Sequence, residues 1–173
     1  INIKAGRYRI AKDMTNNDII NSLRSQNLAV TVAFNNQHSL GLLAQRISNQ
    51  VEADSLSLME VFTDSVFLSS NAFTKESALA MYLPNSYEFF WNTSPKKIRS
   101  KLYKAYNNFW TSSRKQKAQG MGLTPVEVSI LAAIVQEESK ELTEQSKIAG
   151  VYMNRLKNNW ALQADPTLKF AAY

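Results

Sequence analysis

The sequence predicts an α+β protein in two parts: a small strand–helix module over residues 1–65 and a mainly helical domain over residues 66–173. Three observations support this organisation. Residues 28–34 form a short run rich in apolar and β-branched side chains, which is typical of a strand. Residues 39–62 carry apolar side chains at the spacing of amphipathic helices. From Thr124 onwards, helical spacing again dominates.

The first part is predicted to contain strand, helix, strand, helix and helix in that order. Residues 1–10 alternate weakly, as a strand would. Thr15 is the expected N-cap of the first helix, Ser39 opens the second, and Asp54 or Ser55 opens the third.

The second part begins with irregular structure and continues with long helices. Residues 75–81 predict a short helix, and residues 83–87 predict a turn because they contain proline and asparagine. Ser94 is the expected N-cap of a helix that runs to about Lys117, with proline at its first position. Two glycines end this helix before the next one starts at Thr124.

Composition excludes several classes of function. The chain has no cysteine, which excludes disulfides and thiolate chemistry. Its single histidine, His38, disfavours a histidine metal site or a Ser-His-Asp triad. The net charge of +6 suits a polyanionic partner. However, the basic residues of 96–117 follow an amphipathic helix and predict no nucleic-acid partner.

No apolar run of roughly 18 residues predicts a membrane span. The chain starts at Ile1 without an initiator methionine, so we expect it to be a piece of a longer protein.

Glu138 is the residue best placed for acid–base chemistry. Thr124 and Glu127 form a capping box that sets the start of its helix. At about 100° per residue, Glu138 lies about 20° from the apolar stripe centred on Leu131, whereas Glu137 lies about 120° away. A carboxyl group against apolar walls is typical of the general acid of a glycosidase. A helix end that emerges into solvent remains the alternative.

Three motifs resemble those of the MltG (YceG-like) family of endolytic murein transglycosylases. They are residues 131–139 (Leu-Ala-Ala-Ile-Val-Gln-Glu-Glu-Ser), residues 148–156 (Ile-Ala-Gly-Val-Tyr-Met-Asn-Arg-Leu) and residues 162–167 (Leu-Gln-Ala-Asp-Pro-Thr). Residues 83–87 (Leu-Pro-Asn-Ser-Tyr) are a weaker match. The resemblance covers nearly the whole chain. Many relatives have glutamate where this chain has Gln136, so the catalytic role is carried over to Glu138.

The resemblance implies a fold and an activity. Residues 1–65 would form a LysM-like module that binds peptidoglycan, and residues 66–173 a lysozyme-like catalytic domain truncated at its C-terminus. Glu138 would cleave the MurNAc-β-1,4-GlcNAc bond without water, leave a 1,6-anhydroMurNAc end and so terminate nascent glycan strands. Because the nucleophile belongs to the substrate, no second carboxylate is required. No metal or cofactor is implied.

The resemblance also suggests residues that bind substrate, each with a structural alternative. They are Ser139, Asn154, Gln163, Asp165, Thr167 and Tyr87. Ser139 could instead steady the helix end, Asp165 could be a helix N-cap, and Arg155 could form a structural ion pair. Tyr87 and Trp91 could stack on sugar rings, although core aromatic residues are commoner.

The implied setting is the cell envelope. The partners would be peptidoglycan glycan strands, and peptidoglycan synthases are further candidates. The full-length protein would be anchored at the periplasmic face of the inner membrane by an N-terminal helix that lies outside this chain.

Two rival functions stay open. A hydrolytic muramidase would use Glu138 as the acid and Asp165 as nucleophile or base. A noncatalytic peptidoglycan-binding protein would use only the LysM-like module.

Overall fold

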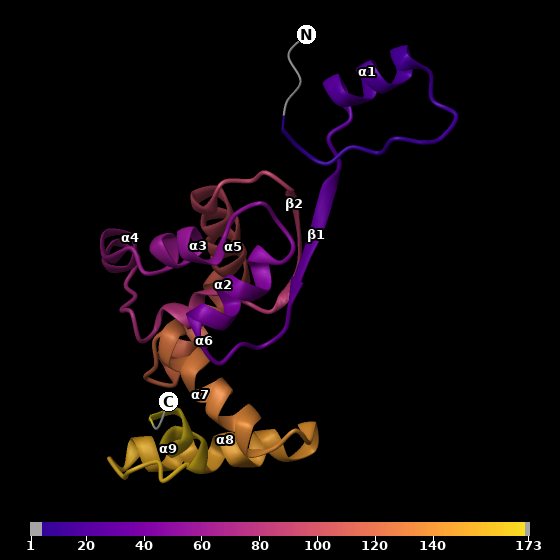
Figure 1. The fold of residues 1–173 in the computed structure, drawn as a ribbon. Coiled ribbons are helices and arrows are strands. Elements are labelled where there is room, and N and C mark those ends of the chain that lie inside the picture. Colours follow the sequence, from indigo (N-terminus) through magenta and orange to yellow (C-terminus); the bar gives the residue numbers. More distant parts are fainter. Residues whose placement is uncertain (1–4, 172–173) are drawn as a thin grey trace. The chain divides into compact units, whose positions relative to one another are not determined.

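The chain folds into two compact units that divide after Phe109, and the computed structural model describes residues 5–171 (Figure 1). The first unit combines helices with a two-stranded sheet, and the second is helical. The structure is therefore α+β, as predicted. The boundary expected near residue 65 falls inside the first unit, because strands from either side of it pair with each other.

The predicted helix starts of the first unit are confirmed. The side chains of Thr15, Ser39 and Asp54 each accept a hydrogen bond from a backbone N–H in the first turn of the helix that follows. In chain order the elements are α1 (Asn16–Ser25), β1 (Ala29–Phe34), α2 (Leu40–Ser48), α3 (Ser55–Phe62), α4 (Ser65–Ser70), the 3-10 helix η1 (Ala78–Met81), β2 (Asn85–Phe90) and α5 (Pro95–Phe109).

The sheet consists of β1 and β2 in antiparallel pairing, with Val32 opposite Tyr87. Alternate side chains of both strands are buried, among them Val32, Tyr87 and Phe89. The turn predicted over residues 83–87 is therefore wrong from Asn85 onwards. The local signal of proline and asparagine was overridden by pairing with a strand more than 50 residues earlier.

An apolar core lies between the helices and the sheet of the first unit. Helix α3 packs against both α2 and α5, and α2 also packs against β1. The largest fully buried apolar side chains come from these elements and from α4 and η1: Phe62, Leu43, Ile47, Leu58, Leu68, Met81, Ile98, Leu102 and Val32. This core fixes the position of both strands.

Two further predictions for residues 5–117 need correction. Residues 5–10 form no strand, and residues 1–4 lie outside the described part of the chain. The helix expected to reach Lys117 ends at Phe109, because Thr111 caps a new helix by accepting a hydrogen bond from the Arg114 N–H. This break coincides with the division between the two units.

The second unit has a small core between helices. Its elements are α6 (Ser112–Gly120), α7 (Pro125–Glu138), α8 (Leu142–Lys157) and α9 (Asp165–Ala171). Helix α7 packs against both α8 and α9. The buried residues Val135, Tyr152 and Ala164 form the centre of the contact.

Within residues 5–171, no single helix is long and apolar enough to cross a membrane. Helices α6 and α7 meet the length and composition criteria only together, and they are bent by 75° where they join.

Candidate active site

Helix α7 positions Glu138 at its C-terminal end. Thr124 and Glu127 form the predicted capping box, which fixes the start of the helix. Glu138 is the last helical residue, and the backbone of Ser139 is extended. Val135, one turn earlier, is buried against Tyr152. Glu138 therefore leaves the helix beside the core of the second unit.

Among residues 5–171, the Glu138 carboxylate has one hydrogen-bonding partner, the Tyr152 phenol. The Tyr152 hydroxyl donates to Glu138 Oε1 over 2.7 Å. Tyr152 lies on α8 and is only 6% exposed. Burial in the first place, and then the hydrogen bond to Glu138, raise the pKa of Tyr152 to about 12. The phenol therefore keeps its proton at neutral pH and remains a donor.

A pocket of about 320 Å³ surrounds this pair. Its polar lining comes from α7, α8, α9 and the segment before α9, and its apolar wall comes from α8. The lining residues are Glu138, Ile148, Val151, Tyr152, Arg155, Gln163 and Asp165. The structure thus brings Glu138 of the first motif together with Gln163 and Asp165 of the third, and Tyr152 and Arg155 of the second motif line the same pocket.

Arg155 holds the segment that carries Gln163. Its guanidinium donates to the Leu162 carbonyl, and its own carbonyl accepts from the Trp160 N–H. Gln163 has a φ of 50°, in the left-handed region that few non-glycine residues adopt. These contacts give the segment before α9 a defined shape. Arg155, which we had considered for an ion pair, is anchored to a carbonyl group.

The other predicted binding residues lie outside the pocket lining. The Ser139 hydroxyl donates to Glu144 and accepts from the Glu141 N–H, so it ties the end of α7 to the start of α8. Asn154 is exposed on α8. The Thr167 hydroxyl donates to the Ala164 carbonyl in the first turn of α9.

Tyr87 lies in the core of the first unit. It faces inwards from β2, stacks on Phe34 with ring centroids 5.6 Å apart, and donates its hydroxyl hydrogen to the Leu83 carbonyl. Burial raises its pKa. The structure therefore gives Tyr87 a packing role and offers no exposed ring face for a sugar.

The predicted burial of Glu138 is wrong, because its side chain is exposed. Of the apolar stripe of α7, Leu131 and Ile134 are half-buried and Val135 is buried, but the helix ends one turn later and the Glu138 side chain is exposed. Glu137 is exposed as well and pairs with Lys140 over 3.1 Å. The two neighbouring glutamates therefore differ in their partners: a buried phenol for Glu138, and a surface ammonium for Glu137.

The role of Tyr152 was not predicted from the sequence, where this residue stands only as part of the motif of residues 148–156. The available signal was the spacing of Ile148, Tyr152 and Arg155, which places them on one face of α8. Which glutamate the phenol meets depends on how α8 packs on α7, and the sequence alone does not contain that information.

A glutamate and a tyrosine beside an open pocket define a candidate site for acid–base chemistry in a helical unit. The profile of the YceG-like family matches residues 1–173, so the chain belongs to this family. The resemblance stated from the motifs is thereby confirmed.

Two relatives show how far the similarity extends. An endolytic murein transglycosylase of Bacillus subtilis (strain 168) is 26% identical over 186 residues, which cover 98% of this chain and 51% of the relative. The chain thus spans about half the length of that relative. A crystal structure of a yceG-like protein from Listeria monocytogenes has a TM-score of 0.73 at 21% identity, covering 99% of this chain and 62% of that one. The similarity to the Listeria monocytogenes structure concerns the fold alone.

Proposed function

We propose that the protein is an endolytic lytic transglycosylase of murein (peptidoglycan) and that Glu138 is its acid/base. The observation that carries this proposal is the Glu138 carboxylate, held by a buried phenol in a pocket it shares with Gln163 and Asp165. The membership of the family and the name of the Bacillus subtilis relative indicate the substrate.

In the proposed reaction, protonated Glu138 first gives its proton to the oxygen that links MurNAc to GlcNAc. The bond from this oxygen to C1 of MurNAc breaks, and positive charge develops at C1. The Glu138 carboxylate then takes the proton of the C6 hydroxyl of the same MurNAc, and the C6 oxygen bonds to C1. The product has a 1,6-anhydro ring, Glu138 regains its proton, and no water is consumed.

The neighbouring residues support this cycle. Tyr152 binds Oε1 of Glu138, which leaves Oε2 to carry the proton. Tyr152 also stabilises the carboxylate that exists between the two steps. Gln163 and Asp165, in the same pocket, would bind the sugar. Ser139, Asn154 and Thr167 would contribute through the shape of the surrounding segments.

The test is the chemical nature of the new sugar ends. Sacculi are digested with the purified protein, and the masses of the soluble fragments are measured by mass spectrometry before and after borohydride reduction. We expect ends that are lighter by one water than reducing ends and that borohydride does not change. Ends that borohydride reduces would contradict the proposal.

Replacing Tyr152 by phenylalanine should slow the reaction about tenfold, because it removes a hydrogen bond to a charged group. A hydrogen bond donated to a carboxylate favours its charged form. The loss should appear in kcat more than in KM, because the hydrogen bond stabilises the carboxylate that exists between the two steps. The measurement is kcat and KM. The control, Tyr103→Phe, removes a phenol from α5 and should change neither; an unchanged kcat in Tyr152→Phe would contradict the role of the phenol.

A hydrolytic muramidase is the second candidate, because Asp165 lines the same pocket as Glu138. Most glycoside hydrolases use two carboxyl groups that flank the glycosidic bond. Asp165→Asn would separate the two readings: hydrolysis needs the second carboxylate, whereas the proposed transglycosylation should keep most of its rate.

We further propose a setting for the protein. Residues 1–65 would act as a LysM-like module that binds peptidoglycan strands. The protein would act in the cell envelope, at the periplasmic face of the inner membrane, where peptidoglycan synthases are candidate partners.

A further inference from the structure

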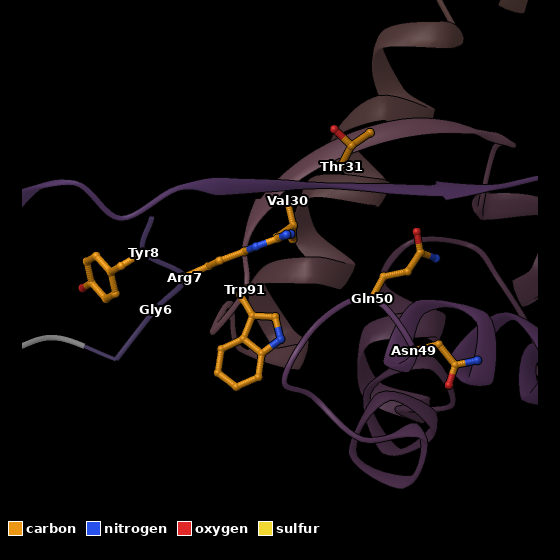
Figure 2. A pocket seen from close by; sticks show the side chains of 8 residues that line it. All are labelled: Gly6, Arg7, Tyr8, Val30, Thr31, Asn49, Gln50 and Trp91. Atoms are coloured by element: carbon orange, nitrogen blue, oxygen red, sulfur yellow. The ribbon is translucent and has the colours of Figure 1, made fainter. Parts of the chain in front are cut away.

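A second pocket, of about 640 Å³, lies in the first unit (Figure 2). Its lining comes from the N-terminal segment, the start of β1, the end of α2 and the residue after β2: Gly6, Arg7, Tyr8, Val30, Thr31, Asn49, Gln50 and Trp91. This volume lies within the roughly 300–1,000 Å³ typical of small-ligand sites.

Arg7 and Trp91 are the side chains that a ligand would meet. Figure 2 shows the Arg7 side chain extending along β1 towards Val30, with the Trp91 indole on the same side of the strand. Tyr8 points the other way. Trp91 is 37% exposed, although tryptophan is among the residues that gain most from burial. Among the described residues, the Arg7 guanidinium forms no ion pair.

The wall that carries Arg7 is fixed by hydrogen bonds. The Arg7 N–H donates to the Asn27 side chain over 3.0 Å, and the Arg7 carbonyl accepts from the Leu28 N–H over 2.8 Å. The Asn92 side chain donates to the Ala5 carbonyl over 2.8 Å. Gly6 allows the close approach, because a Cβ there would lie 2.4 Å from the Asn27 oxygen.

The opposite wall is fixed as well. The Trp91 carbonyl accepts from the Glu52 N–H over 2.9 Å, which ties the end of β2 to the loop after α2. The Gln50 side chain bonds to both backbone groups of Ala33. Gln50 is therefore engaged, whereas the neighbouring Asn49 amide is exposed at the rim. Both walls of the pocket are thus held in place by hydrogen bonds.

This combination of groups fits an acidic sugar. The face of an indole carries partial negative charge and attracts the C–H groups on one face of a pyranose ring. A guanidinium binds a carboxylate through two parallel hydrogen bonds. An amide at the rim can bond to hydroxyl or acetamido groups. Murein offers all three partners, because both of its alternating sugars carry acetamido groups and every second sugar bears an acidic peptide on a lactyl ether.

We propose that this pocket is a second saccharide subsite, in which Trp91 stacks on a sugar ring and Arg7 binds a carboxylate of the same murein strand. The identity of the polymer rests on the proposed function, whereas the recognition of an acidic saccharide rests on the pocket alone. The subsite would hold a murein strand on the first unit, where the buried Tyr87 offers no ring face to a sugar.

The test is binding to insoluble sacculi, measured by sedimentation over a range of protein concentrations. Every sample carries Glu138→Gln, so turnover cannot alter the sacculi. We expect Trp91→Ala to weaken binding about tenfold and Arg7→Gln about fivefold. Sacculi whose carboxylates have been converted to amides form a second arm, on which Arg7→Gln should have no effect.

Two matched controls lie beside the pocket. Phe90→Ala removes an aromatic side chain that is 53% exposed and adjacent to Trp91, and Arg9→Gln removes an exposed cation two residues from Arg7. Neither residue lines the pocket, so both variants should bind like the parent. Circular dichroism checks that Trp91→Ala is folded. Because Arg7 is exposed, Arg7→Gln leaves the apolar core unchanged.

The inference is overturned if Trp91→Ala and Arg7→Gln bind as tightly as their controls. It is also overturned if Arg7→Gln weakens binding equally on amidated sacculi, since no carboxylate would then be involved. Binding is measured without turnover, so it does not depend on the reaction that the protein catalyses. If the analysis of sugar ends contradicts the transglycosylase proposal, the binding result still tests the subsite.

Discussion

Glu138→Gln should reduce the release of anhydro ends from sacculi by about 10²–10⁴-fold, the usual contribution of a general acid or base. Glutamine has the size of glutamate and still accepts a hydrogen bond from Tyr152, so the fold and the pocket should persist. It cannot give or take the proton that both steps require. The measurement is the rate at which sugar ends appear, determined by mass.

Glu137→Gln is the matched control, because it makes the same chemical change one residue earlier on the helix. Glu137 pairs with Lys140 on the surface and lines no part of the pocket. An exposed ion pair contributes at most about 1 kcal/mol, so both stability and rate should change little. A dead Glu137→Gln beside an active Glu138→Gln would reverse the assignment.

Leu58→Ala should lower the free energy of unfolding of the first unit by about 2–5 kcal/mol. Leu58 is fully buried on α3, between the neighbouring helices α2 and α5. Truncation removes apolar contacts and leaves a cavity that the packed core can fill only in part. The measurement is urea unfolding followed by circular dichroism.

Leu56→Ala provides the comparison within the same helix. Leu56 is 77% exposed, so the same truncation should change stability by no more than about 0.5 kcal/mol. Equal losses in the two variants would mean that α3 does not bury the face described above.

Local chemistry was enough to predict most helices of the fold. A capping side chain bonds to a backbone N–H two or three residues later, so a short stretch of sequence is enough to predict it. The helix starts predicted at Thr15, Ser39 and Thr124 therefore agree with the structure. Strand β2 was missed because its partner is distant in sequence and its residues Pro84 and Asn85 resemble a turn. The break at Thr111 was missed because no proline or glycine marks it, and the first glycine after Pro95 comes at Gly120.

The sequence predicted the candidate acid/base residue of the site, but it did not predict the burial or the hydrogen-bond partner of that residue. The angle of Glu138 on α7 placed it on the side of the helix that carries Val135, and the structure agrees, because Val135 is buried in the core of the second unit. The burial of Glu138 was overestimated, because a helical angle gives a direction and does not show where the covering residues end. Gln163 and Asp165 were placed near Glu138 only through the resemblance to the family motif. The pairing of Tyr152 with Glu138 depends on how α8 packs on α7, which the sequence does not show.

The central claim is that Glu138 drives a cleavage that uses no water. The most direct measurement is digestion of sacculi in water labelled with heavy oxygen, followed by mass analysis of the new ends. The account predicts ends without label, because the C6 hydroxyl of the substrate supplies the oxygen that bonds to C1. One heavy oxygen at C1 of each new end would show hydrolysis and contradict the account.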